Sequence, residues 1–270
     1  MEKPSVIFDI RTSENALQTL CCLTNVPKNI WECYVGTESN YQYSGRIVEH
    51  VVKTYGNMPT NYRDWDFIYF HITTSNNECL SFKKYGILDL KSSYLCPDSE
   101  LRIFLDNHNV HIDLEKRELE YNGQVHDITF GDCPRRDTKE YACWCVGRKF
   151  YYDFTTCGFL SVWDLRPYGG MVHCRPEILN DIDNLLNTKL SQEWMLSHKP
   201  YEVTAKVEGG KIIFDGSDES TEQEKVLYYL THAYDTAFGY PSEVLLLLKD
   251  NIEISPEDII DIKPMQCWKR

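Results

Sequence analysis

The sequence predicts an α+β fold in which antiparallel strands outnumber any strand–helix–strand units. Residues 1–62 carry apolar side chains at helical spacing, which indicates a mostly helical segment. Residues 110–130 alternate around Asn122-Gly123, the strongest short signal for a β-hairpin. Residues 243–249 are rich in Val and Leu, the composition of a buried strand. Helical and hairpin signals therefore share one chain without alternating regularly.

Each expected helix combines an apolar stripe with a capping residue or a stop signal. Ser13 precedes the first stripe and Pro27 ends it, while Gly56 and Gly86 follow two later stripes. On this basis we expect helices over residues 13–26, 44–55, 78–85, 99–107, 175–186 and 221–237.

Short apolar runs rich in aromatic or β-branched residues predict the strands. Gly209-Gly210 separates two such runs and predicts a second hairpin. We expect strands at residues 66–71, 87–90, 110–130, 142–163, 201–207, 211–214 and 243–249, with a final strand after residue 255.

Two units are expected, a helical segment over residues 1–62 and a core over residues 63–270. The apolar stripe that includes Leu17 and Leu20 must pack on something, because such a helix is stabilised mainly by burying one face. Residues 57–62 contain too little Gly or Ser for a long flexible tether. We therefore expect the helical segment to dock on the core.

Charge and composition exclude several classes of protein. The 270 residues include 28 basic and 41 acidic side chains, a formal net charge of −13, which argues against a constitutive nucleic-acid binder. No apolar run approaches the ~20 residues that cross a bilayer, and the first residues lack the apolar stretch of a secretory signal. The 11 cysteines are scattered and odd in number, which favours reduced thiols. We expect a cytoplasmic protein that does not enter a membrane.

Short motifs far apart in the chain carry the functional signal. His71-Ile-Thr-Thr-Ser75 follows an expected strand, and a helix and Tyr85-Gly-Ile-Leu88 come next. Pro241-Ser-Glu243 begins the late strand, and Ile254-Ser-Pro-Glu-Asp-Ile259 follows it. This order resembles the His-Tyr-Glu branch of the ADP-ribosyltransferase superfamily, over about residues 64–265. The wider likeness is to bacterial toxins and phage-defence proteins of that superfamily.

The resemblance implies that NAD is the co-substrate and that nicotinamide is released. Glu243 would stabilise the oxocarbenium-like ribose as its positive charge develops. His71 would hydrogen-bond a ribose hydroxyl of the adenosine half, and the backbone of Ile72 and Thr73 would hold the nicotinamide amide. Thr73 and Thr74 offer further hydroxyl groups. The sequence contains neither GxGxxG nor GxxxxGK[ST], and the family requires no glycine-rich phosphate loop.

The family's middle aromatic residue has more than one candidate here. Tyr168, in the expected turn Arg166-Pro-Tyr-Gly-Gly170, is favoured because a turn can place its ring over a ligand. Tyr151 and Tyr152 lie on an expected strand, which would direct only one of them into a cleft. Tyr85 lies at the end of an expected helix. Arg175 is a candidate for the NAD pyrophosphate, although packing at a helix end is its plainer and favoured role.

Two other chemistries fit less well. Cys143 and Cys145 would share one face of a strand, but with Cys133 and Cys157 they lack the paired spacing of a zinc site. His108-x-x-His111 has no further ligand at a matching distance, and the neighbours His173 and Cys174 would point to opposite faces of a strand. The residues weighed for these two chemistries are His108, His111, Cys133, Cys143, Cys145, Cys157, His173 and Cys174. No metal is therefore expected.

The sequence predicts an ADP-ribosyltransferase toxin or antiviral effector that modifies a macromolecule. The acidic composition favours a protein acceptor, whereas the resemblance favours RNA or DNA, and the two remain open. The resemblance also implies that an antitoxin or chaperone is a candidate partner. The alternatives are a non-catalytic binding module on the same fold and, more distantly, a zinc-dependent hydrolase.

Overall fold

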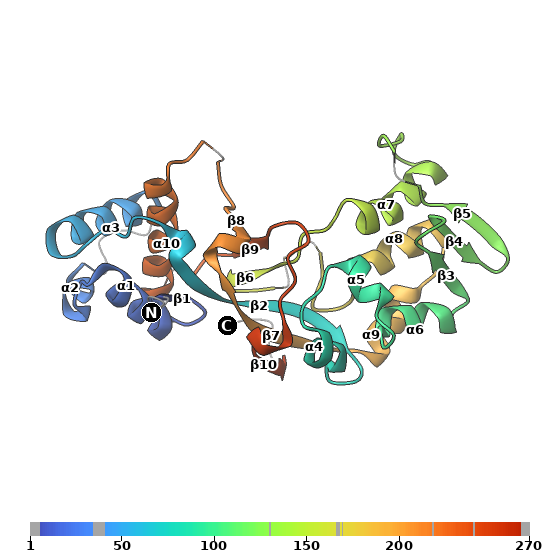
Figure 1. Cartoon of the computed structure of the whole chain (residues 1–270), viewed down its shortest axis with the longest axis horizontal. Helices are drawn as coiled ribbons and strands as arrows, with labels where there is room; N and C mark the ends of the chain where they lie inside the picture. Colours follow the sequence, from blue (N-terminus) through green and yellow to red (C-terminus); the bar gives the residue numbers. More distant parts are fainter. Residues whose placement is uncertain are drawn as a thin grey trace.

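The computed structural model describes residues 6–34, 41–129, 131–165, 168, 170–217, 219–239 and 241–265. A seven-stranded sheet runs through the middle of the molecule, and helices gather at its two ends (Figure 1). Its strands are β1 (Val6–Asp9), β2 (Trp65–Ser75), β6 (Cys157–Ser161), β7 (Lys199–Glu208), β8 (Ile212–Ile213), β9 (Val244–Leu248) and β10 (Ile259–Pro264).

The sheet has the order β10-β7-β2-β6-β9-β8, and these neighbours are antiparallel. β7 pairs along almost the whole of one edge of β2. The other edge is shared, because β1 pairs in parallel from Trp65 to Ile68 and β6 pairs at Phe70. The expected α+β class with mainly antiparallel strands is confirmed.

The N-terminal helices and one late helix cluster at one end of the sheet (Figure 1). They are α1 (Ser13–Thr24), α2 (Lys28–Cys33), α3 (Tyr41–Tyr55) and α10 (Glu222–Ala237). Their buried side chains, with those of β1 and β2, form the largest apolar cluster, which includes Trp31, Phe67 and Tyr229. The tyrosine hydroxyl of Tyr234 on α10 donates to the carbonyl of Tyr34, 2.7 Å away. The N-terminal segment thus shares both a sheet and a core with the rest of the chain.

A second group of elements lies at the opposite end, around an apolar cluster that includes Leu105, Phe150 and Trp194 (Figure 1). Its helices are α5 (Leu90–Leu95), α6 (Glu100–Asn107), α7 (Lys139–Tyr151), α8 (Glu177–Leu186) and α9 (Leu190–Ser197), and its strands are β3 (Val110–Asp113), β4 (Glu118–Tyr121) and β5 (Gln124–Asp127). The short helix α4 (Leu80–Tyr85) precedes this group. Three 3₁₀ turns complete the elements, η1 (Tyr62–Asp64), η2 (Gly209–Lys211) and η3 (Pro256–Asp258).

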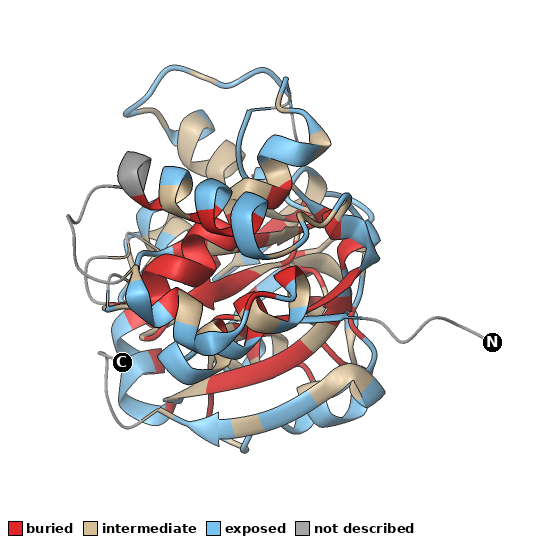
Figure 2. Ribbon diagram, turned by 90° about the vertical axis from the view of Figure 1, so that its left-hand side faces the viewer, coloured by how far each residue is buried: buried red, intermediate tan, exposed pale blue. Residues whose placement is uncertain are grey.

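Buried residues concentrate along the strands and on the helix faces that pack on them, while the outer faces are exposed (Figure 2). Along β9, the burial alternates strictly, as expected for a strand with one face toward a core. On α10 the buried side is unusually wide and covers most of the residues from Tyr229 to Thr236. This helix is therefore the central covering element at its end of the sheet.

Three sequence expectations about elements were wrong, and one strand was missed. Residues 142–151 belong to helix α7, so the expected strands at Cys143 and Cys145 do not exist, and only Cys157–Ser161 of that region forms a strand. Gly209-Gly210 is not a hairpin turn, because β7 pairs with β2 and β10 while β8 pairs with β9. Residues 87–90 form a single bridge, Ile87 to Ile254, before α5 begins. The N-terminal segment also contains a strand, β1.

Candidate active site

A cavity of about 270 Å³ lies beside the C-terminal half of β2, between the sheet and helices α4 to α9. It collects His71, Thr73, Thr74 and Tyr168, four of the residues predicted from the motifs. The other lining residues come mostly from helices and loops, and they are Ser81, Phe82, Leu88, Asp89, Leu90, Ser93, Ser99, Glu100, Leu101, Lys149, Asp153, Thr155, Thr156, Cys157, Val172, Pro176, Glu177, Ile178 and Trp194. The cavity combines apolar walls with a few polar groups, as small-molecule sites commonly do.

His71 lies within β2, four residues before the strand ends at Ser75, and not at the strand end as expected. Its Nδ1 is 2.8 Å from the carbonyl oxygen of Cys157. A carbonyl only accepts, so Nδ1 carries the proton in this contact and Nε2 is left as an acceptor in the neutral ring. Burial lowers the pKa of His71, which favours this neutral form. His71 therefore offers a ligand a hydrogen-bond acceptor.

The Thr-rich stretch after His71 splits between the two faces of β2. Thr73 and Thr74 line the cavity, and the Thr74 hydroxyl accepts a 2.8 Å hydrogen bond from Nε1 of Trp194. The side chain of Ile72 instead packs in the apolar cluster with Phe70 and Phe159. Because β6 begins at Cys157, the backbone edge of β2 that faces away from β7 has no strand partner beyond Ile72 in the described residues. Of Ile72 and Thr73, only Thr73 lines the cavity, so the open edge of β2 borders the cavity at Thr73.

Tyr168 lines the cavity, and its ring meets that of Phe159 edge-on at 5.3 Å. Burial raises the pKa of Tyr168, and the charges of Glu177 and Glu243 raise it further. Arg166, Pro167 and Gly169 of the expected turn lie outside the described residues. Tyr168 is therefore the predicted aromatic residue that the fold brings to the cavity.

The other tyrosine candidates lie elsewhere. Tyr151 is the last residue of α7 and Tyr152 follows it, so neither lies on a strand as expected. The hydroxyl of Tyr151 donates to the carbonyl of Leu114, and Tyr152 is 62% exposed. The hydroxyl of Tyr85 is 3.3 Å from Asp98. None of these three tyrosines lines the cavity.

Glu243 immediately precedes β9, and its side chain is exposed outside the cavity lining. β9 runs antiparallel to β6, with Leu247 opposite Cys157. Since a strand rises ~3.3 Å per residue, Glu243 lies roughly 13 Å along the sheet from the level of Cys157. Its charge nevertheless acts on Tyr168. Glu243 therefore influences a residue of the cavity without lining it.

The segment that carries Glu243 is held by two hydroxyl contacts. Ser161 at the end of β6 donates to the carbonyl of Ser242 at 2.7 Å. The hydroxyl of Ser242 is 3.2 Å from Nδ1 of His232 on α10. Both contacts fix the residue that precedes Glu243, so its exposed carboxylate projects from an anchored backbone.

Arg175 precedes α8 and does not line the cavity, and its guanidinium contacts the carbonyl of Pro176 at 3.4 Å. The cation inside the cavity is Lys149, which sequence analysis missed. Its ammonium lies 2.8 Å from Glu177 and 3.2 Å from Asp153. Burial lowers the pKa of Lys149, but these two carboxylates outweigh burial and leave it raised. The signal for this cluster was the i, i+4 spacing of Lys149 and Asp153, which only a helical interpretation makes meaningful.

The cysteine and histidine candidates for a metal site do not converge. Cys143 and Cys145 are two residues apart on helix α7, so they do not share a face as two residues of a strand would. His108 pairs with Glu193, and His111 pairs with Asp106. Within the described part of the chain, no three His, Cys, Asp or Glu side chains form a group that could hold a metal ion.

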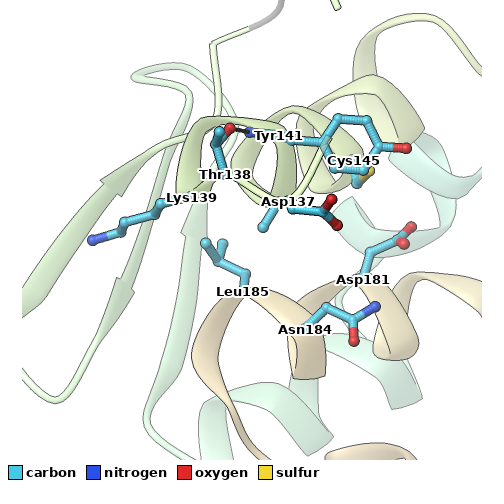
Figure 3. A pocket seen from close by; sticks show the side chains of 9 residues that line it. Asp137, Thr138, Lys139, Tyr141, Cys145, Asp181, Asn184 and Leu185 are labelled. Atoms are coloured by element: carbon cyan, nitrogen blue, oxygen red, sulfur yellow. Dashed lines mark hydrogen bonds between the residues drawn. The ribbon is translucent and has the colours of Figure 1, made fainter. Parts of the chain in front are cut away.

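A second cavity, of about 480 Å³, opens between the start of α7 and the middle of α8 (Figure 3). Asp181 and Asn184 of α8 lie across from Tyr141 and Cys145 of α7 (Figure 3). Burial raises the pKa of Asp181. This cavity contains none of the residues that the motifs predicted.

Comparisons with known proteins identify no relatives, because no family model, curated protein or solved structure matches the chain. In the described residues, no helix combines the length and apolar character needed to cross a membrane.

Proposed function

We propose that the chain is an NAD-dependent ADP-ribosyltransferase that transfers ADP-ribose to a macromolecule and releases nicotinamide. One observation carries the proposal: the three motif residues lie on, after and before three strands that are adjacent in the sheet. His71 lies on β2, Tyr168 follows β6 and Glu243 precedes β9. Of these, His71 and Tyr168 line one cavity together with Thr73 and Thr74.

In this proposal the residues divide the work of binding and catalysis. Nε2 of His71 accepts a hydrogen bond from a ribose hydroxyl, and the free backbone edge near Ile72 holds the nicotinamide amide. The ring of Tyr168 stacks on nicotinamide. As the glycosidic bond breaks, the ribose gains positive charge, and a carboxylate close to it stabilises the transition state more than the ground state. Glu243 has this role, reaching the ribose from the far side of Tyr168.

The proposed biological role is that of a toxin or antiviral effector that acts in the cytoplasm. The acceptor is RNA, DNA or protein, and an antitoxin or chaperone that covers the cavity is a further proposed partner. Incubation of the purified protein with labelled NAD and separate pools of RNA, DNA and lysate protein identifies the acceptor. Label in none of the pools, without nicotinamide release, contradicts the proposal.

Glu243→Gln provides the sharper test. We expect nicotinamide release to fall by about 10²–10³, the usual effect of losing one such charged group. Because Glu243 is exposed and outside the apolar clusters, the melting temperature should not change. Glu219→Gln, at another exposed carboxylate, is the matched control and should retain full activity. Full activity of the folded Glu243→Gln protein would remove Glu243 from the mechanism.

A second candidate function is a non-catalytic binding module. The observation that favours it is the position of Glu243, which is exposed and does not line the cavity. A binding module retains NAD or another nucleotide without releasing nicotinamide. Measuring NAD affinity and nicotinamide release on the same preparation separates the two functions.

A further inference from the structure

Thr156 is the clearest unexplained polar group of the cavity. It lies in the loop between α7 and β6, is 5% exposed and lines the cavity, yet its hydroxyl has no hydrogen-bond partner. Its backbone is fixed, because its carbonyl accepts a 2.9 Å hydrogen bond from the amide of Leu248. A buried hydroxyl without a partner is unfavourable, and nearly all such groups in proteins are satisfied. A ligand that fills the cavity can supply the missing partner.

A charged cluster borders the same part of the cavity. Glu177 and Asp153 act on the thiol of Cys157, the residue after Thr156, and add to the effect of burial in raising its pKa. Glu177 also lies close to Tyr168. A Cβ atom added at Gly170 would lie 2.1 Å from Oε1 of Glu177 and 2.9 Å from Cε1 of Tyr168, so these two atoms are at most 5.0 Å apart.

The charge of the cavity selects the kind of ligand. Its described lining contains four carboxylates, on Asp89, Glu100, Asp153 and Glu177, and one ammonium, on Lys149, which leaves −3 with His71 neutral. A phosphate inside such a cavity would be repelled. Ligand hydroxyl groups suit this cavity. Glu177 can accept a hydrogen bond from a hydroxyl group, Lys149 can donate one to its oxygen, and the hydroxyl of Thr156 can donate or accept.

We propose that Thr156, Lys149 and Glu177 form a hydroxyl-binding subsite that holds the ribose of a ribonucleoside, with its phosphates outside the cavity. Apolar walls such as Leu101, Ile178 and Trp194 receive the base. The choice of a nucleoside rests on the proposed function, in which NAD is the ligand. The subsite then selects ribose over deoxyribose, and the ion pair between Lys149 and Glu177 holds these two ligand-binding groups in place.

The test measures the affinities of NAD, adenosine, 2′-deoxyadenosine and 3′-deoxyadenosine by calorimetry for the wild type and Thr156→Val. We expect the variant to bind NAD and adenosine about threefold to tenfold more weakly, the effect of one hydrogen bond. The deoxynucleoside that lacks the contacted hydroxyl should bind both proteins equally. Thr156→Ser keeps the hydroxyl and should keep the affinity, which separates hydrogen bonding from packing.

Thr236→Val is the matched control, because Thr236 on α10 is also buried without a hydrogen-bond partner but lies outside the cavity lining. It should bind all four ligands as the wild type does. If Thr156→Val binds every ligand as tightly as the wild type while the wild type releases nicotinamide, the subsite is wrong and the transferase proposal stands. If the wild type binds neither NAD nor adenosine, both proposals are wrong.

Discussion

At the scale of single residues, burial sets the hydrogen-bonding character of the cavity. His71 is held neutral by burial and uses Nδ1–H for Cys157, so its remaining nitrogen accepts. Protonation would turn Nε2 into a hydrogen-bond donor, so the site would then prefer an acceptor on the ligand instead of a hydroxyl donor. The same side chain therefore links ligand affinity to pH.

We expect His71→Ala to weaken NAD binding by about tenfold or more, because its contact with the ligand is lost. The affinity of the wild type should be constant above the usual histidine pKa and fall at lower pH, as His71 gains a proton. Affinity measured from pH 8 to pH 5 checks this, with His111→Ala, an exposed histidine, as the control. An unchanged affinity in the folded His71→Ala protein contradicts the ligand role.

His232 makes a separate prediction about stability. Burial lowers the pKa of His232 from 6.5 to about 4. The unfolded chain therefore binds this proton first as the pH falls, so stability present above pH 6.5 is lost between pH 6.5 and about 4. At ~1.4 kcal/mol per pKa unit, the loss reaches about 3 kcal/mol. Urea unfolding at several pH values measures it, and His232→Gln should flatten the profile by that amount. An identical profile in the variant would show that other groups cause the dependence.

The motifs predicted part of the site and missed the rest for a definable reason. His71, Thr73 and Thr74 reach the cavity because they lie on β2, where a sequence pattern fixes position well, and Tyr168 reaches it from the loop after β6. Lys149 and Asp153 were missed, because they lie at the end of a helix and in the loop after it, within residues 142–163 that were expected to form strands. A site assembled by tertiary packing leaves little local signal in the sequence.

At the scale of elements, helix α7 explains the largest error. Its residues read CWCV and KFYY, short apolar runs that fit a buried strand or a buried helix equally well. Locally, Thr138 favours the helix over a strand, because its hydroxyl accepts a hydrogen bond from the amide of Tyr141 and caps the helix. Tertiary packing also favours the helix, because Gly147 lets it lie directly against the backbone at Ile128.

Replacing Gly147 tests that close approach. A Cβ at Gly147 would lie 2.1 Å from the carbonyl oxygen of Ile128, which is backbone and cannot easily move. We expect Gly147→Ala to destabilise the protein by about 1–3 kcal/mol, despite the ~1 kcal/mol that alanine usually gains over glycine in a helix. Gly45→Ala on α3 is the control, since its nearest neighbour is 3.5 Å away, and it should stabilise slightly. Urea unfolding of both variants measures the difference, and a stabilised Gly147→Ala protein would contradict the steric argument.

The two glycine-containing turn signals had opposite outcomes. Asn122 and Gly123 both have positive φ angles, 50° and 77°, and join β4 to β5 as predicted. Gly209 is required for a different reason, because a Cβ there would lie 2.4 Å from the carbonyl oxygen of Tyr62. The sequence shows that a glycine is needed but does not distinguish a turn from a close contact with a distant segment.

At the scale of the whole molecule, the N-terminal segment is joined to the rest by backbone and side-chain contacts. The guanidinium of Arg11 donates to the hydroxyl of Thr204 on β7 at 3.2 Å, and the hydroxyl of Tyr234 on α10 donates to the carbonyl of Tyr34 at 2.7 Å. β1 adds to the edge of β2. Removal of residues 1–62 would expose both the edge of β2 and the apolar face of α10.

We therefore expect limited proteolysis to leave the chain near residue 60 intact under native conditions. We also expect a fragment of residues 65–270 to be insoluble or to melt well below the full chain, because the largest apolar cluster would lose about a third of its buried residues. Gel electrophoresis of the digest and a thermal melt of the fragment check the two expectations. Rapid cleavage near residue 60 that releases a stable, active fragment would show that the segment is a separate and dispensable unit.

The contact between α1 and α10 also determines when the protein is complete during its synthesis. A ribosome that has made α1 must add the 213 residues from Thr24 to Ala237 before the covering helix exists. At ~5–20 residues per second, this takes on the order of 10–40 s. Throughout that interval the apolar side of α1 lacks its final partner. The nascent chain thus passes through a long aggregation-prone stage, and the strand that carries His71 gains its full support only when nearly nine-tenths of the chain has been made.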